Sequence, residues 1–121
     1  MAKEFRIFTQ VWDPEAKDHH YAAVKVSGTD LGYGLFAWKE TGRTLHPEAR
    51  WYISDIKTGT GIPKLNPGEH EGKPNIRFAT LADCKAWVKN IPEEYKTKID
   101  AARASAKYQE LITTFENLPK E

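Results

Sequence analysis

The sequence has a single cysteine, Cys84, so no disulfide can form within the chain. It also has no apolar run near the roughly 18 residues that a membrane-spanning helix needs, and its first residues, Met1–Glu4, include no apolar leader segment. An excess of one charge is missing too, because 18 basic residues are balanced by 17 acidic ones, a net charge of +1. These absences predict a cytoplasmic protein without a membrane partner, and they exclude a bulk field that would attract nucleic acid.

What the chain does contain is typical of one globular domain. Its 121 residues are enough to bury a hydrophobic core without disulfides or metals. A hydrophobic content of 40% and a charged content of 29% are ordinary for such a domain. Cys84 lies between Leu81 and Val88 at helical spacing, which indicates a small apolar core residue. We therefore expect a single domain over residues 1–121.

The first two-thirds of the chain alternates between side-chain types with a period of two residues, which is typical of β-strands. Strands are predicted over residues 5–12, 21–27, 34–39, 50–57, 60–62 and 76–79. Turn residues at Gly28-Thr29-Asp30 and Thr58-Gly59 would separate neighbouring strands. Residues 63–75 hold three prolines and two glycines and predict a surface loop. The expected result is an antiparallel sheet of about five strands within residues 3–79.

Two helix-start signals follow the predicted sheet. Thr80 and Asp83 match a capping box, in which a threonine is followed three residues later by an acid, and they predict a helix over about residues 81–89. Asn90 is a good helix cap and Pro92 is tolerated in a first turn, so a second helix is predicted over about residues 91–118. Two helices packed on one face of an antiparallel sheet define the α+β class, which is the fold class we expect.

The second predicted helix carries two apolar stripes on opposite sides. The first stripe contains Ile91, Tyr95, Ile99, Ala102 and Ala106, and the second contains Tyr108, Leu111, Ile112, Phe115 and Leu118. A bend near residues 104–107 would fold the second stripe onto the sheet, whereas a straight helix of about 42 Å would carry it beyond the domain to a partner. We favour the partner, because each large side chain left in water forgoes about 1.5–3 kcal/mol. The predicted anchors are Tyr108, Leu111, Ile112 and Phe115.

These anchors predict a small protein-binding or regulatory module without enzymatic activity. It would form a homodimer through its C-terminal helix or bind another protein. The plan of a strand, the Thr58-Gly59 turn, a further strand and a helix capped at Thr80-Leu81 is similar in outline to small accessory proteins of bacteria and their phages. That resemblance implies modulation of a host protein.

A second hypothesis is nucleic-acid binding by aromatic and basic side chains on the strands. Its predicted contact residues are Trp38, Lys39, Arg43, Arg50, Tyr52 and Lys57. The glycine-aromatic signature of an RNA-recognition sheet is absent, and the balanced charge gives no support. Most of these rings are therefore more simply explained as core.

A third hypothesis is a small-molecule or metal site in the loops around His19, His46 and His70. None of these histidines has a recognised ligand spacing, so no metal ligand and no cofactor is predicted. Asp55 is the one charged residue at an apolar-face position of a predicted strand, where burial would require a partner. We expect it to be exposed near the strand end. Since no Gly-x-Ser-x-Gly elbow is present either, no catalytic residue is predicted.

Overall fold

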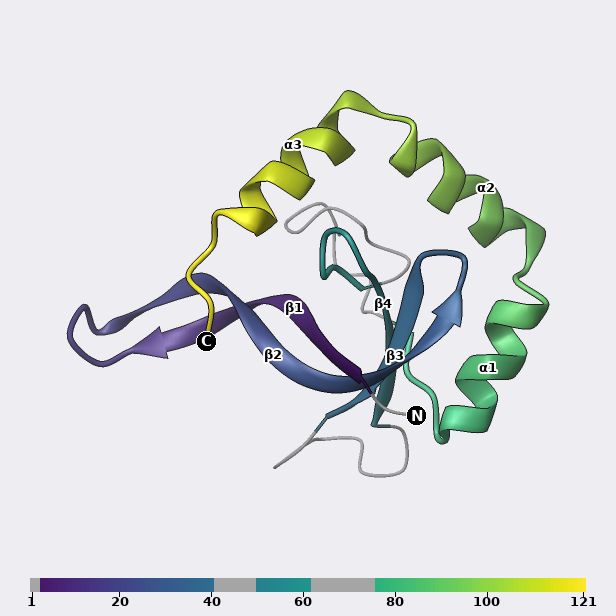
Figure 1. Cartoon of the computed structure of the whole chain (residues 1–121), viewed down its shortest axis with the longest axis horizontal. Helices are drawn as coiled ribbons and strands as arrows, with labels where there is room; N and C mark the ends of the chain where they lie inside the picture. The colour runs from purple at the N-terminus through teal and green to yellow at the C-terminus, as the bar shows by residue number, and fades with distance from the viewer. Residues whose placement is uncertain (1–2, 41–49, 62–75) are drawn as a thin grey trace.

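The computed structural model describes residues 3–40, 50–61 and 76–121. Strands come first and helices follow, which confirms the α+β class (Figure 1). The strands are β1 (Lys3–Asp13), β2 (Asp18–Gly32), β3 (Leu35–Lys39) and β4 (Trp51–Asp55). The helices are α1 (Leu81–Lys89), α2 (Glu93–Arg103) and α3 (Ala106–Glu116). Within the described ranges, none of the helices is long and apolar enough to cross a bilayer.

The sheet is an antiparallel meander in which each strand pairs with the next along the chain, in the order β1-β2-β3-β4. β1 and β2 pair from Lys3 opposite Gly28 out to Asp13 opposite Asp18. β3, in contrast, pairs only with the last residues of β2. The far end of the β1–β2 hairpin therefore projects beyond the other strands (Figure 1). We call residues 10–21 of this hairpin the arm.

The sheet curls until its two edge strands are linked. The turn that follows β4 pairs back onto that strand through a bridge between Ser54 and Gly61. In the same turn, the Gly59 carbonyl accepts a hydrogen bond from the N–H of Phe8 in β1 (3.0 Å). Gly59 has φ +67°, and a Cβ there would lie 2.6 Å from the Phe115 ring. Both the backbone conformation and the lack of space therefore require glycine at this joint.

The C-terminal tail pairs with the edge of β2 at the base of the arm. Residues 119–121 run parallel to β2, and Ala23 both donates to the Pro119 carbonyl (2.9 Å) and accepts from the Glu121 N–H (3.1 Å). The Arg6 guanidinium donates to the same Ala23 carbonyl (2.8 Å). These bonds satisfy backbone groups that β3 does not reach, so this edge of β2 is covered where the arm begins.

The hydrophobic core lies between the sheet and the helices, which follow one another in an arc along one side of it (Figure 1). To the central cluster of this core the sheet contributes side chains from β3 and β4, and each helix contributes one buried side chain. The buried members are Leu35, Ala37, Ile53, Cys84, Ile99 and Tyr108. The prediction that Cys84 is a small core residue is thus confirmed, and burial raises the pKa of its thiol to about 12.

The opposite face of the sheet is covered in part by β1. Phe5 stacks on Phe36 with ring centroids 4.4 Å apart and ring planes within 6°. A Cβ at Gly28 would lie 2.9 Å from the Phe5 ring and 2.7 Å from the Ala37 carbonyl oxygen. Gly28 therefore sits inside β2, where the curled sheet leaves no room for a side chain. The turn predicted over residues 28–30 was wrong for this reason.

The single helix predicted over residues 91–118 is two helices, α2 and α3. Ser105 separates them, because its backbone is extended and its Oγ accepts a hydrogen bond from the N–H of Tyr108 (3.2 Å). That is the N-cap arrangement that serine favours, and it starts α3 in a new direction. Asn90 was also misassigned, since it ends α1 as the C-cap, and α2 follows Pro92 instead.

The sheet has four strands in the described residues, not about five. The two short strands predicted over residues 60–62 and 76–79 are reduced to single bridges, one of them between Phe78 and Trp51. Each segment meets β4 at one residue pair, which is too little contact for a ladder. The loop predicted over residues 63–75 lies outside the described residues.

Candidate functional site

The second apolar stripe of the C-terminal segment packs against the protein's own sheet. Tyr108 belongs to the same core cluster as Ile99 of the first stripe. Phe115 stacks on Phe8 of β1, with ring centroids 6.0 Å apart. The predicted anchors divide into buried Tyr108 and Phe115 and half-buried Leu111 and Ile112. Because the chain turns at Ser105, Tyr108 and Ile112 of the second stripe contact the same interior as Ile99 of the first, and contacts within the chain account for their burial.

A buried carboxylate joins the sheet to both α2 and α3. Asp55, the last residue of β4, is 1% exposed. Arg103 of α2 donates to its Oδ1 from Nε (3.2 Å) and Nη2 (2.8 Å). Tyr108 of α3 donates to Oδ2 (2.7 Å), which also accepts from the N–H and hydroxyl of Thr58 (3.1 and 3.0 Å). The expectation that Asp55 is exposed was wrong, because distant helices supply the partners that its burial requires.

The role of this cluster follows from the number of hydrogen bonds that the Asp55 carboxylate accepts. The five hydrogen bonds to Asp55 occupy the roughly four lone-pair sites of an ionised carboxylate. Burial, followed by the hydrogen bond to Asp55, raises the pKa of the Tyr108 hydroxyl, so this group remains a donor at neutral pH. A carboxylate with no site left for a substrate proton is unsuited to act as a general base. The cluster holds α2 and α3 against β4.

Two of the six residues predicted for nucleic-acid binding lie together. Trp38 and Tyr52 are opposite each other on β3 and β4, and their rings stack 4.9 Å apart. Lys39 is on the other face of β3, and Lys57 lines a separate pocket beside the Asp55 cluster. The last two are Arg50, which is half-buried, and Arg43, which lies outside the described residues. Of the described basic side chains in this set, Lys39 and Lys57 therefore lie away from the two rings.

Of the three predicted histidine loops, only the one around His19 lies in the part of the chain that the structure describes. His19 contacts the Trp12 ring, and His20 hydrogen-bonds to the side chain of the last residue (2.9 Å). His46 and His70 lie outside the described residues. Among residues 3–40, 50–61 and 76–121, no three histidine, cysteine or acidic side chains are grouped so that they could hold a metal ion.

An aromatic stripe, which we call the arm stripe, runs from the core out along the arm. It begins at Phe115 in α3, continues at Phe8, and reaches Tyr21, whose ring meets Phe8 edge-on at 5.2 Å. Farther out, Trp12 is paired across the hairpin with His19, also edge-on at 5.2 Å. Residues 8 and 12 of β1 and residues 19 and 21 of β2 share one face in this register, since side chains alternate along a strand.

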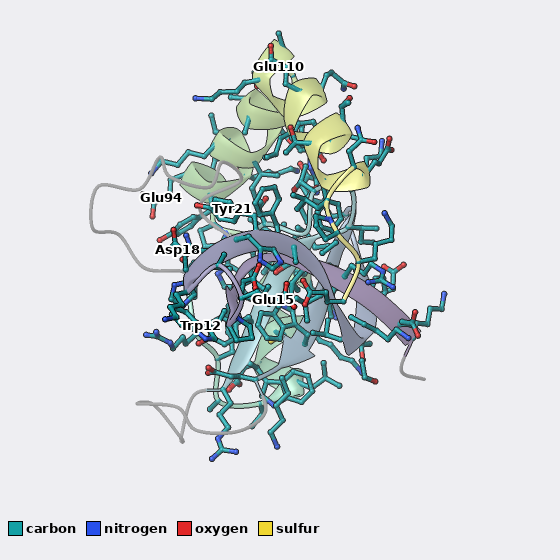
Figure 2. All side chains as sticks on the ribbon, turned by 90° about the vertical axis from the view of Figure 1, so that its left-hand side faces the viewer. Trp12, Glu15, Asp18, Tyr21, Glu94 and Glu110 are labelled. Carbon is teal, nitrogen blue, oxygen red and sulfur yellow. The ribbon has the colours of Figure 1, made fainter. Side chains whose placement is uncertain are left out.

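The outer half of the arm stripe is open to solvent. Trp12 is 57% exposed and Tyr21 is 43% exposed, the highest values among the large hydrophobic side chains of the described residues. Glu15, in the turn, and Asp18, the first residue of β2, lie at the same end of the hairpin as these rings (Figure 2). Residues 13–18 of this turn carry three acidic side chains and one basic side chain. The arm thus presents exposed rings next to an acidic turn.

This stripe was missed in the sequence although a signal for it is present. Phe8 and Trp12 lie at alternate positions with Arg6 and Gln10, on the side of the first strand opposite Ile7. Aromatic residues on the polar side of a strand indicate an exposed or shared face. The contact between Asp55 and Arg103 had no such signal, because local patterns carry no information on residues so far apart in sequence.

Comparison with known protein families, with curated proteins and with solved structures gives no match. Function is therefore inferred from the geometry of this chain alone.

Proposed function

We propose that the protein is a binding module that recognises another protein through its arm, with Trp12 and Tyr21 as the anchoring side chains. The observation that carries this proposal is the arm stripe, whose outer rings are exposed while its inner rings are half-buried (Phe8) or buried (Phe115). Tryptophan and tyrosine are the side chains that most often dominate the energy of protein interfaces. Both rings stand on one face of a projecting hairpin, where a partner surface can reach them.

The arm is ordered in advance for such a contact. Tyr21 packs on Phe8, which in turn packs on Phe115 in the core. The tail bonds to Ala23 at the base of the arm, and the side chain of Glu121 bonds to His20 (2.9 Å). A partner would therefore bind without first ordering the hairpin, and that lowers the entropy cost of association.

Charge supports a basic protein surface as the partner. The turn of the arm carries Asp13, Glu15 and Asp18 against the single lysine Lys17. Phosphate groups of nucleic acid would be repelled by these carboxylates, since like charges near an interface cost free energy. In a two-fold homodimer through the arm, the same carboxylates would face their own copies. Lysine and arginine side chains around an apolar pocket would complement the exposed rings and the acidic turn together.

Photo-crosslinking in the cells that carry the gene tests this proposal. In three variants, p-benzoylphenylalanine replaces Trp12, Tyr21 or Tyr33. Tyr33 is the matched control, because it is also an exposed tyrosine but lies in the β2–β3 turn, away from the arm. The first two variants are expected to crosslink the same protein and the third is not.

The crosslinked protein is then purified and its affinity measured. Trp12→Ala is expected to weaken binding by about 30-fold, and raised salt to weaken it further. Tyr33→Ala should leave binding unchanged. Crosslinks to nucleic acid or to a second copy of the chain, or equal crosslinking from all three positions, would overturn the proposal. A crosslink between copies would instead indicate a homodimer through the arm, which differs from the dimer through the C-terminal helix that the sequence predicts.

A further inference from the structure

A pocket lies on the sheet face away from the helices. This pocket of about 370 Å³ opens between β1 and the outer face of β3 and β4, which falls in the range of about 300–1,000 Å³ of small-molecule sites. Its described lining residues include Thr9, Trp38, Glu40, Tyr52, Ser54 and Arg77. None of its lining residues belongs to the exposed part of the arm stripe, so the pocket and the arm can be tested separately.

The aromatic wall of the pocket is held in place by bonds to its polar atoms. The Trp38 indole N–H donates to the Ser54 hydroxyl (2.9 Å), and Ser54 is itself buried. Trp38 also stacks on Tyr52, so its ring plane is fixed by two independent contacts. A rigid, half-buried ring that lines a pocket is a surface on which another planar ring stacks.

A donor and an acceptor stand side by side at the same wall. The Tyr52 hydroxyl accepts from Arg77 Nε (3.0 Å) and donates to Glu40 Oε2 (3.2 Å), so one phenol holds both charged groups. The Nε bond leaves the two terminal nitrogens of the Arg77 guanidinium as a donor fork. The second carboxylate oxygen of Glu40 remains an acceptor. The pocket thus offers adjacent N–H donors and a carboxylate acceptor beside an aromatic plane.

The geometry points to a guanine base as the ligand of this pocket. Guanine presents the O6 acceptor next to the N1–H and N2–H donors, which matches the adjacent Arg77 and Glu40. Arginine to O6 is the commonest specific contact to guanine, and a carboxylate accepts from ring and amino N–H groups. Adenine presents an N6 amino donor where guanine has O6, which would face the guanidinium donor-to-donor. A free guanosine nucleotide and a guanine in a single strand share this chemistry.

Titration of the full chain with 5′-GMP, followed by tryptophan fluorescence and by calorimetry, tests the assignment. GMP is expected to bind and quench fluorescence, and AMP to bind more weakly by roughly tenfold or more, because a well-placed contact to a base edge discriminates against the wrong base by about 1–3 kcal/mol. A guanine-containing single-stranded trimer is compared with GMP to distinguish a strand from a free nucleotide as the source. Tighter binding of the trimer assigns the strand, and equal or weaker binding assigns the nucleotide.

Variants of the pocket test whether GMP binds at this site, which selectivity for GMP over AMP does not show by itself. Glu40→Gln and Arg77→Gln, both chosen because they leave the core untouched, are expected to reduce GMP affinity by roughly tenfold or more while the melting temperature stays unchanged. Trp12→Leu is the matched control for the fluorescence signal, because Trp12 is exposed on the arm, and it should leave the affinity unchanged. Equal binding of GMP, AMP and inorganic phosphate, no binding of GMP at millimolar concentration, or full affinity in both glutamine variants would overturn the assignment.

Discussion

The Asp55 cluster and the arm place polar and aromatic side chains in opposite situations. At Asp55 every partner comes from the chain itself, since α2, α3 and the turn after β4 all bond to one buried carboxylate. On the arm, the chain supplies partners for the inner rings and leaves about half of the surface of Trp12 and Tyr21 in water. A group that is fully satisfied within the fold stabilises the fold. An aromatic side chain that stays exposed at a projecting site is available to bind a partner protein.

This comparison predicts that stability and recognition depend on different residues, and variants can test that separation. Substitutions in the Asp55 cluster should change the free energy of unfolding and leave arm recognition intact in the folded molecules. Substitutions at the tip of the arm should do the reverse.

The largest loss of stability is expected for Arg103→Met. It leaves Asp55 buried without its cationic partner, which costs about 3–5 kcal/mol when both groups are buried. Because Arg103 is 23% exposed and water can reach part of its site, we expect the lower end of that range. Urea denaturation measures the effect. Lys96→Met, which removes an exposed lysine from the same helix, is the control and should change stability by less than about 0.5 kcal/mol.

A double variant sharpens this result. If Arg103 and Asp55 act as a pair, Asp55→Asn combined with Arg103→Met should cost clearly less than the sum of the two single variants. Additive losses would show that the ion pair is not the unit that joins α2 to β4.

The next effect concerns the joint between β4 and β1. Gly59→Ala introduces a Cβ 2.6 Å from the Phe115 ring at a positive φ, and we expect a loss of about 2–4 kcal/mol. Gly32→Ala is the matched control, because Gly32 also has a positive φ but no atom lies within 4 Å of the added Cβ. It should lose only the backbone component, about 1–2 kcal/mol. Equal losses in urea denaturation would contradict the packing of α3 against this joint.

A smaller effect with a distinctive pH dependence is expected for Tyr108→Phe. At neutral pH the variant should lose about 1.5 kcal/mol, since one donor to the buried carboxylate is removed. An unfolded tyrosine releases its proton near about pH 10, whereas the raised pKa keeps native Tyr108 protonated there. The unfolded state therefore binds fewer protons, and the stability present below that pH falls as the pH rises further.

Comparing the wild type with Tyr108→Phe isolates the contribution of the Tyr108 hydroxyl to the pH dependence of stability. Wild type should lose stability more steeply than Tyr108→Phe above about pH 10, so the gap between their unfolding free energies should narrow. A gap that stays constant into the alkaline range would mean that Tyr108 is not protonated and bonded to Asp55 as described.

The smallest effect on stability is expected at the tip of the arm. Trp12→Ala should change the free energy of unfolding by less than about 0.5 kcal/mol, because the side chain is largely in water already. Trp87→Ala is the contrasting variant, since Trp87 packs between Phe78 and Tyr95 at 6.1 and 5.8 Å. It should lose about 2 kcal/mol, less than a fully buried tryptophan, because Trp87 is only partly buried. Comparable losses at both tryptophans would show that the arm tip is part of the core.

The sequence predicted those elements whose signals are local. α1 spans the predicted residues 81–89, and Thr80 caps it by accepting from the N–H of Asp83 (3.1 Å). The two opposed stripes were also read correctly as a pattern. The direction in which the second stripe faces was not predicted. The cap at Ser105 decides whether the chain turns back onto the sheet or continues as a straight helix. Good helix formers on both sides of that serine hid the break.

The rest depended on contacts between distant segments. The segment Gly28-Thr29-Asp30 has the composition of a turn. Only the close approach of Phe5 and β3 explains why Gly28 lies inside a strand. The partners of Asp55 lie on helices that the strand pattern could not place. The pocket at Trp38 requires β1 to curl over β3 and β4, and curl is a property of the whole sheet.

The most direct test measures partner affinity and melting temperature together for Trp12→Ala and Phe115→Leu, two variants at opposite ends of the arm stripe. The account predicts that Trp12→Ala weakens binding of the crosslinked partner by about 30-fold at an unchanged melting temperature. Phe115→Leu should lower the melting temperature and leave the affinity of the folded protein unchanged. Loss of affinity in Phe115→Leu with full affinity in Trp12→Ala would contradict it.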